Sequence, residues 1–346
     1  MYSNLKNNFA YRFTINRKGG RHMNVSSQLK KEYIGIKQSE SGFYPEGVLF
    51  NSYGNKRTLS SLCGINEAYA DGRTLEGRVT LCDSEHNLHV DLGCMKGIIP
   101  RNEGALGIDD GTVRDIALIS RVNKPVCFKI IGFDRDENSQ QRAILSRKAV
   151  QAECMERLVN SLKSGDVIGA RVTHLESFGV FADIGAGISA LMPIDSISVS
   201  RIPHPSVRFT TGQDIRAVVK GIDEQNRVTL SHKELLGTWE QNVEEFMPGQ
   251  TVPGIVRSVE KYGIFVELSP NLAGLAEYSE GIEPGNAASV YIKSIIPERM
   301  KIKLIIVDSF SDPSQVMPIK YYTDCDHIDR FVYSPECCEK VIESIF

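Results

Sequence analysis

Hydrophobic and polar residues alternate through much of residues 74–308, and this period of two is typical of strands that bury one face. The stretch SFGVFADIG at 177–185 has the pattern in its clearest form. Its apolar face consists of Val180, Ala182 and Ile184. The alternation places Phe181 and Asp183 on the opposite face, and a glycine bend leaves Phe178 beside Phe181. Either a neighbouring loop covers both rings, or the strand presents them on its outer surface.

The alternating pattern recurs along the chain. The segment GARVTHLESFGVFADIG at 169–185 aligns without a gap with PGIVRSVEKYGIFVELS at 253–269, and both contain an aromatic-Gly-X-Phe turn. A degenerate copy, EGRVTLCDSEHNLHVDLG at 76–93, has histidines at the turn positions. Because the ring pair recurs in two copies, we favour the outer placement of the rings over a covered one.

Each copy continues through three further short strands, which makes a unit of about seventy residues. Five strands with glycine-rich turns fit a small closed barrel, since such a unit is long enough to close on itself. Helical periodicity is confined to 149–165 and 234–250, between the units, and each of these stretches reaches a glycine that would stop a helix. The sequence therefore predicts a mainly β fold, with three tandem five-stranded barrels joined by short helices.

The two ends differ from the repeats. A short helix is expected over 58–72, with Thr58 as its cap and Gly72 as its stop. The tail is expected to form a strand or hairpin over 319–334 and a short helix over 336–346, packed on the third barrel. The predicted segments are a basic, disordered arm at 1–31, an N-terminal segment at 32–73, a degenerate barrel at 74–150, a helical linker at 151–164, a barrel at 165–236, a second helical linker at 237–248, a third barrel at 249–308 and a C-terminal extension at 309–346.

The first 31 residues contain seven lysines and arginines and no acidic residue. This arm could be an RNA-contacting tail, an acid-poor transit peptide, or translated sequence upstream of a start at Met23 rather than Met1. The lack of an apolar helical stripe favours a disordered arm among these alternatives.

Composition limits the possible partners. Forty basic residues stand against forty-three acidic ones, for a formal charge of −3, which argues against a uniformly basic coat for nucleic acid. Binding to a polyanion must therefore be local. No run of eighteen apolar residues occurs, so we expect no membrane partner. The eight cysteines have no regular spacing, which indicates reduced thiols and a cytoplasmic protein.

Two features resemble the S1 RNA-binding domain, a five-stranded oligonucleotide-binding barrel. The first is the aromatic-Gly-X-Phe turn followed by a small-residue strand and by an aspartate four residues before an arginine in IDEQNRVTLSHK (222–233). The second is LSHKELLGTWEQNVEEFMPGQTVPGIV (230–256), which is similar to the connectors of bacterial ribosomal S1 proteins. Thr238 stands where those connectors usually have proline. The resemblance covers residues 74–308.

The resemblance implies that the turn rings and nearby charged positions form a platform on which nucleobases stack. In the middle copy these positions are Phe178, Phe181, Pro193, Asp223 and Arg227, where Pro193 replaces a frequent histidine. In the third copy they are Tyr262, Phe265, Glu277, Pro297 and Lys301. In the first copy they are His86, His89, Asp134 and Arg142, which are weaker candidates because imidazoles stack less well than phenyl rings. Exposed rings give sequence-tolerant stacking worth about 1–3 kcal/mol per base, and cations on the same face bind phosphates.

Competing chemistry has little support in the sequence. Phosphate-loop, GxSxG and HExxH motifs do not occur, and the spacing of Cys325, His327, Cys337 and Cys338 is poor for zinc. We therefore expect no metal, no cofactor and no catalysis. The leading hypothesis is non-catalytic binding of single-stranded RNA (mRNA) in translation, at the 30S small ribosomal subunit. The alternatives are an RNA-binding accessory of an RNA-decay or transcription assembly, and an enzyme whose chemistry lies in the terminal segments.

Overall fold

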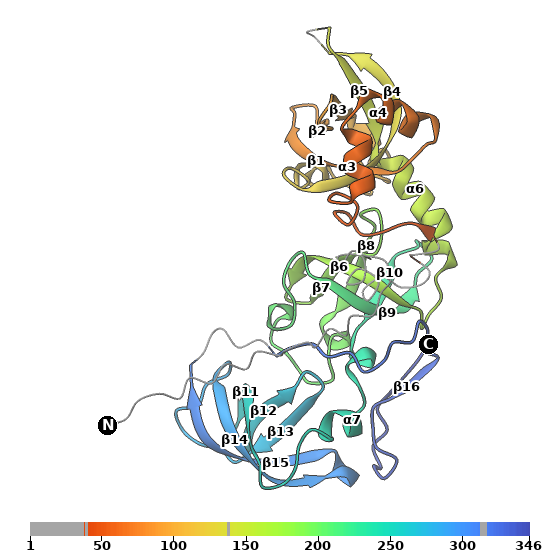
Figure 1. Cartoon of the computed structure of the whole chain (residues 1–346). Helices are drawn as coiled ribbons and strands as arrows, with labels where there is room; N and C mark the ends of the chain where they lie inside the picture. The colour runs from red at the N-terminus through yellow and green to blue at the C-terminus, as the bar shows by residue number, and fades with distance from the viewer. Residues whose placement is uncertain (1–37, 39–40, 137–138, 312–316) are drawn as a thin grey trace, which may run out of the picture. The chain divides into compact units, whose positions relative to one another are not determined.

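The computed structural model describes residue 38 and residues 41–136, 139–311 and 317–346 (Figure 1). The predicted basic arm at 1–31 lies outside these residues, and so does the choice between Met1 and Met23. The described chain is mainly β and contains three closed five-stranded barrels, which confirms the predicted fold class.

The first barrel has the strand order β1-β2-β3-β5-β4. Its strands are β1 (Leu75–Cys82), β2 (Leu88–Asp91), β3 (Lys96–Ile99), β4 (Pro125–Arg135) and β5 (Gln141–Ser146). Inward residues such as Val79, Leu88 and Leu145 are fully buried, as the alternation predicts. The parallel pairing of β3 with β5 closes the barrel, and Gly97 on β3 leaves room for the side chain of Leu145. A short helix, α5 (Ile116–Ile119), lies between β3 and β4 in the chain.

The middle barrel repeats this topology, with the order β10-β8-β7-β6-β9. Its strands are β6 (Val167–Glu176), β7 (Gly179–Asp183), β8 (Ser189–Pro193), β9 (Asp214–Ile222) and β10 (Val228–Ser231). Val180, Ala182 and Ile184 are fully buried, so the predicted apolar face of SFGVFADIG is confirmed. The loop between β8 and β9 contains two 3₁₀ turns, η3 (Ile194–Ser196) and η4 (Pro205–Val207).

The third barrel has the order β11-β12-β13-β15-β14. Its strands are β11 (Thr251–Glu260), β12 (Gly263–Ser269), β13 (Leu272–Ala276), β14 (Ala287–Ile296) and β15 (Lys301–Phe310). The 3₁₀ turn η6 (Pro297–Arg299) joins the last two strands. In all three barrels the closing contact is a parallel pair between the third and the fifth strand in chain order.

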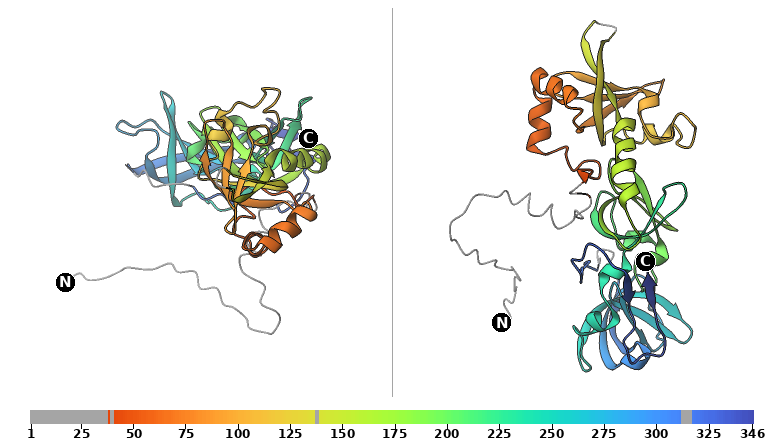
Figure 2. Two further views of the ribbon diagram at one scale, coloured as in Figure 1. Left: turned by 90° about the horizontal axis from the view of Figure 1, so that it is seen from above. Right: turned by 90° about the vertical axis from the view of Figure 1, so that its right-hand side faces the viewer.

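Both stretches with predicted helical periodicity contain helix, but neither helix runs to the glycine that was expected to stop it. The first connector is α6 (Arg147–Arg157), which is followed by the 3₁₀ turn η2 (Val159–Ser161). Ser146 caps the start of α6, because its hydroxyl accepts a hydrogen bond from Ala149 N at 2.9 Å. Figure 2 shows α6 leading out of the first barrel, and it packs on β4. The second connector is shorter than expected and consists of η5 (Lys233–Leu236) and α7 (Trp239–Val243). Thr238 starts α7 with a capping box, which explains how threonine replaces the proline usual at this position.

The helix predicted over 58–72 is in fact two helices, α3 (Tyr53–Leu59) and α4 (Leu62–Ala70). Thr58 is not a cap, because it lies in the last turn of α3. The caps are Ser52, whose hydroxyl accepts from Asn55 N, and Ser61, whose hydroxyl accepts from Gly64 N. Gly72 follows α4 with a φ of +60°, so it stops the helix as predicted.

The prediction of a C-terminal helix over 336–346 is wrong. The tail instead turns back on itself, and β16 (Arg330–Val332) pairs with β17 (Glu343–Ile345). Ile342 N donates to the Ser334 hydroxyl and its carbonyl accepts from Tyr333 N, which fixes an extended hairpin. The tail also contacts more than the third barrel: Arg216 of the middle barrel donates to the carbonyls of Thr323 and Cys325 at 2.6 and 2.9 Å.

Candidate nucleic-acid interface

The middle barrel exposes a pair of rings at the start of β7. Phe178 in the turn is 55% exposed, and Phe181 on the outer face of the strand is half-buried. Their ring centroids lie 6.0 Å apart with an interplanar angle of 87°, an edge-to-face arrangement. A Cβ at Gly179 would collide with the carbonyl oxygen of Met192, and Ile194 N donates to the Phe178 carbonyl at 2.9 Å. Backbone packing therefore holds both rings at the surface, as the sequence predicts.

The third barrel repeats this geometry. Tyr262 is 70% exposed, and its ring centroid lies 6.1 Å from that of Phe265 with an interplanar angle of 85°. Gly263 has a φ of +149°, and a Cβ there would collide with the carbonyl oxygen of Ala276. We call these two pairs, Phe178 with Phe181 and Tyr262 with Phe265, the ring platforms.

The first barrel has the same backbone register without the rings. Each barrel has a bulge in its first strand, and the residue just after the bulge pairs with the platform position, as in Leu81 with His89, His174 with Phe181 and Ser258 with Phe265. This pairing supports the gapless alignment of the middle and third copies, and it places His89 of the degenerate first copy at the platform position. His86 lies in the turn with a φ of +63°, and the His89 ring lies 3.0 Å from Asp83 Oδ2. The His89 imidazole is therefore engaged within its own hairpin.

The predicted charged positions lie at the hairpins that follow. Arg227 Nε donates to Asp223 Oδ2 at 2.6 Å, and both side chains are exposed. Arg142 donates two bonds to Asp134, at 2.7 and 2.8 Å. Hydrogen bonds from the backbone and side chain of Arg227 lower the pKa of Asp223, and the bond from Arg142 lowers the pKa of Asp134. Lys301 starts β15 and is exposed.

Strand pairing relates these charges to the rings. Phe181 pairs with Leu191 on β8, and Leu191 pairs with Thr229, two residues after Arg227 on the same side of the barrel. These paired residues form a row across neighbouring strands. In the third barrel the corresponding row consists of Phe265, Leu275 and Lys303, and Lys303 is two residues after Lys301. Sequence reasoning missed the row residues Leu191, Thr229, Leu275 and Lys303. The period of two on β8, β10, β13 and β15 could have identified them, because each alternates with buried neighbours.

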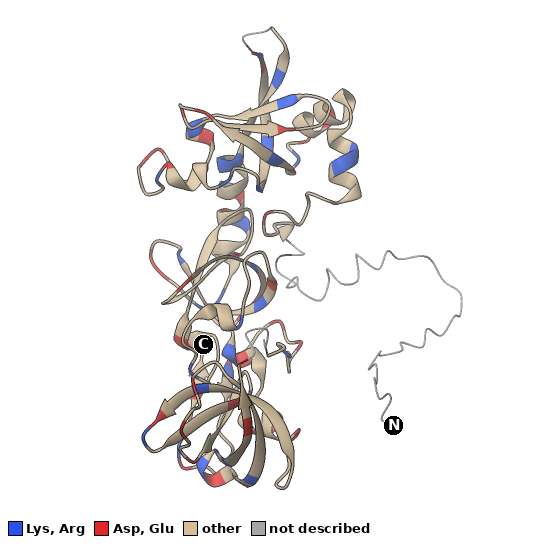
Figure 3. Cartoon of the chain, turned by 90° about the vertical axis from the view of Figure 1, so that its left-hand side faces the viewer, with Lys and Arg blue, Asp and Glu red and all other residues tan. Residues whose placement is uncertain are grey.

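The other predicted platform positions are less favourable. Pro193 pairs with Gly179 and therefore lies beside the rings, where it has no side-chain hydrogen-bond donor. Glu277 follows β13 and is exposed, and Pro297 is the first residue of η6. Figure 3 shows lysines and arginines interspersed with acidic residues over all three barrels. The charge distribution therefore agrees with local rather than general attraction for a polyanion.

Asp183 lies on the face opposite the core, as predicted, but it is buried rather than exposed. Asp183 is only 3% exposed, and its carboxylate accepts hydrogen bonds from Glu46 N at 2.7 Å and from Gly185 N and Gly187 N at 2.8 and 3.0 Å. The alternation of the strand puts this side chain opposite the core, but a segment from before the first barrel covers it. Burial and the negative charge of Glu46 raise the pKa of Asp183 to about 6.

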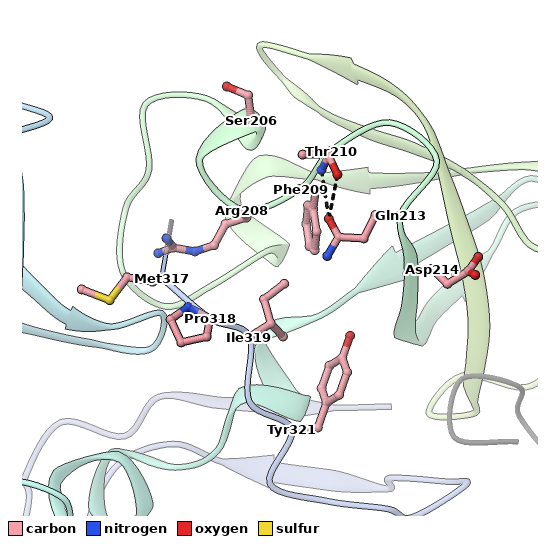
Figure 4. A pocket seen from close by; sticks show the side chains of 10 residues that line it. All are labelled: Ser206, Arg208, Phe209, Thr210, Gln213, Asp214, Met317, Pro318, Ile319 and Tyr321. Carbon is pink, nitrogen blue, oxygen red and sulfur yellow. Dashed lines mark hydrogen bonds between the residues drawn. The ribbon is translucent and has the colours of Figure 1, made fainter. Parts of the chain in front are cut away.

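One cavity of about 300 Å³ lies between the β8–β9 loop and tail residues Met317 to Tyr321 (Figure 4). Several polar groups that line the cavity form hydrogen bonds within the chain. Thr210 N donates to Gln213 Oε1 at 2.9 Å, and the Tyr321 hydroxyl accepts from Arg216 N at 3.0 Å. This arrangement seats the tail on the middle barrel.

The tail residue His327 is held by carboxylates. His327 lies between two carboxylates, 2.9 Å from Asp166 and 3.1 Å from Asp329, which raise its pKa. Within the described ranges, no three His, Cys, Asp or Glu side chains are grouped as metal ligands.

Among the described helices, none combines the length and the apolar character that a membrane span requires.

Comparison with known proteins identifies the family. Residues 161–233, which include the middle barrel, match the S1 RNA binding domain. The chain is 30% identical to the small ribosomal subunit protein bS1 of Staphylococcus aureus (strain MRSA252) over 297 residues, which cover 79% of this chain and 72% of that protein. The chain belongs to the bS1 family. The homologue from Bacillus subtilis (strain 168) is 35% identical over 56% of this chain and 49% of its own length.

The chain covers 65% of the length of bS1 from Staphylococcus aureus (strain COL), at 30% identity over 72% of this chain. Among solved structures, a multidomain protein with nucleic acid binding domains from Streptococcus pneumoniae is 15% identical, with a TM-score of 0.23, over 68% of this chain and 74% of that one. GSP13 from Bacillus subtilis is 21% identical, with a TM-score of 0.20, over 20% of this chain and 55% of its own. Scores this low say nothing about function.

Proposed function

We propose that this bS1-family chain binds single-stranded RNA, including mRNA, without catalysis and acts at the small ribosomal subunit. The observation that supports this most strongly is the presence of two ring platforms with nearly the same geometry, 6.0 Å and 87° in one barrel and 6.1 Å and 85° in the other. Every base has a π-face, so such rings accept unpaired bases with little sequence preference.

The cations near the platforms would contribute the phosphate contacts. Lys301 and Lys303 lie on β15 beside the third platform, while Arg227 is paired with Asp223 near the middle one. A cation already paired with a carboxylate gives less net attraction to phosphate than a free one. The affinity should therefore fall with salt, but with a modest slope.

The barrels are proposed to have unequal roles. The middle and third barrels bind RNA, and the first barrel contacts the ribosome or another partner, because His86 and His89 replace the rings there. Two weak platforms on one chain act together, since binding at one raises the effective RNA concentration at the other.

The test is a titration of a labelled, unstructured RNA oligomer with the full chain at several salt concentrations, with a duplex of the same sequence as control. We expect micromolar-range binding, weaker binding of the duplex, and an affinity that falls with salt. Equal affinity for the duplex, or no dependence on salt, would contradict the proposal. Co-sedimentation with small ribosomal subunits tests the site of action, and enrichment with a nuclease or a transcription complex instead would favour the accessory role.

A further inference from the structure

The carboxylate two residues after each platform phenylalanine joins the ring-bearing strand to an earlier part of the chain. In the middle barrel Asp183 Oδ2 accepts from Glu46 N at 2.7 Å, across 137 residues of sequence. Its other oxygen, Oδ1, accepts from Gly185 N and Gly187 N in the loop after β7. One side chain therefore fixes both the end of its own strand and an incoming segment.

Neighbouring contacts show that this segment is built into the middle barrel. The Gln38 amide donates to the carbonyls of Gly169 and Ile184, each at 2.6 Å, and accepts from Gly169 N at 2.8 Å. Ala186 N donates to the Tyr44 carbonyl at 2.9 Å, and Phe43 is buried in the core of this barrel. The end of β7 is thus held by residues that precede the first barrel.

The third barrel has the same arrangement with different chemistry. Glu267, two residues after Phe265, is fully buried and forms ion pairs with Arg257 on β11 and with Arg208. Arg208 belongs to the β8–β9 loop of the middle barrel, and Figure 4 shows its guanidinium beside Met317 and Pro318. Its Nε and Nη1 atoms have no hydrogen-bond partner in the described structure, so Glu267 is the main acceptor that holds this side chain.

The first barrel has neither a ring platform nor a buried carboxylate at the equivalent position. Asp91 occupies the position equivalent to Asp183, since it pairs with Arg78 as Asp183 pairs with Arg171. It is exposed, and its carboxylate accepts from Gly93 N at 2.9 Å within its own turn. Within this chain, the two barrels that have a ring platform also have a buried, anchored carboxylate, and the barrel without rings has neither.

Burying an ionised carboxylate is costly, and a well-packed apolar residue often stabilises a fold as well or better. Stability alone is therefore a poor explanation for the recurrence of this feature beside the rings. We propose that Asp183 and Glu267 are positioning residues for RNA binding, which couple each ring platform to the docking of the preceding part of the chain. This inference rests on the proposed RNA-binding function. Because such coupling is reciprocal, RNA on the rings should in turn tighten the docked segment.

The first test uses Asp183→Asn in the full chain, in a Phe265→Ala background that leaves the middle platform as the main one. Asparagine keeps an oxygen for Gly185 N and Gly187 N but turns an amide toward Glu46 N, so the loss is confined to the contact with the earlier segment. We expect single-stranded RNA to bind about fivefold more weakly or worse. Asp91→Asn in the same background is the matched control and should leave the affinity unchanged. Unchanged affinity in Asp183→Asn would overturn the proposal.

A second variant guards against a simple folding defect. Arg208→Gln, in a Phe181→Ala background, changes a residue of the middle barrel but should weaken binding at the third platform to a similar extent. If RNA affinity stays the same while Glu267 loses this partner, the proposal is wrong for the third barrel.

Amide hydrogen exchange distinguishes coupling from a purely structural role, because only coupling makes the exchange rate at Glu46 N depend on bound RNA. Saturating RNA should slow exchange at Glu46 N in the native chain, and should fail to do so in Phe181→Ala. If RNA binds and Glu46 exchange does not change, the coupling is refuted while RNA binding stands. If the native chain does not bind RNA at all, the proposed function fails instead.

Discussion

The first and middle barrels have the same strand order, the same bulge and the same register, yet they differ at the residues that face outward from β2 and β7. Val90 and Ala182 are equivalent and both buried, whereas His89 and Phe181 are equivalent and differ in chemistry. The inward positions therefore maintain the barrel, while the outward positions can change without loss of the fold. A barrel of this family can therefore keep its architecture and lose a ring platform.

The largest expected effect concerns the shared core. Ile184→Ala removes a fully buried side chain next to β7 and should lower the free energy of unfolding by about 2–5 kcal/mol through lost burial and a residual cavity. Thermal or urea unfolding of the full chain measures this loss. A change below 1 kcal/mol would show that the inward face does not determine stability as the comparison assumes.

The second prediction concerns a buried acid that distinguishes the first barrel. Glu76 on β1 is almost fully buried where the middle barrel has Gly169, and burial together with the charge of Glu46 raises its pKa to about 8. An acid with a raised pKa in the folded state binds its proton more tightly there than in the unfolded chain. Between about pH 4.5 and 8 the unfolded chain loses this proton while the folded chain keeps it. The free energy of unfolding therefore falls as the pH rises through this range.

Glu76→Gln should remove this contribution, which reaches at most about 1.4 kcal/mol per pH unit. The measurement is urea unfolding of the native chain and of Glu76→Gln at pH 6, 7 and 8. Subtracting the two free energies of unfolding at each pH removes the contribution of the other titrating groups. Parallel curves for the two proteins would mean that Glu76 keeps an ordinary pKa.

The third prediction separates an outward ring from a core residue on the same strand. Phe181→Ala should weaken binding of unstructured RNA by about 1–3 kcal/mol, because one stacked base is lost. Stability should change far less than in Ile184→Ala, since truncation of an outward ring leaves no cavity. A Phe181→Ala variant that melts like Ile184→Ala would place the ring in the core.

How far the sequence can predict this molecule is clear from β7 itself. Its alternation correctly placed Val180, Ala182 and Ile184 inward and Phe181 outward, because a strand's faces depend only on its own period. The burial of Asp183 could not be predicted in this way, because the segment that covers it is distant in the sequence. The same limit applies to the tail, where pairing of β16 with β17 replaced a helix that local pattern favoured.

The smallest effect is a gain of function in the first barrel. His86→Phe with His89→Phe should raise the affinity of the chain for unstructured RNA by about 1 kcal/mol, by placing rings at positions whose backbone register already matches. Loss of the contact between His89 and Asp83 limits the gain. Unchanged affinity would show that the rings alone do not make a platform, and would favour a requirement for the anchored carboxylate.

The central claim is that the ring platforms of the middle and third barrels bind RNA and that the first barrel does not. Fluorescence anisotropy with one unstructured RNA oligomer, comparing Phe181→Ala/Phe265→Ala with His86→Ala/His89→Ala in the full chain, tests it most directly. We predict at least a tenfold loss of affinity for the first pair, since each ring accounts for about 1–3 kcal/mol, and no change for the second. Equal losses in the two variants, or a loss confined to the histidine variant, would contradict the account.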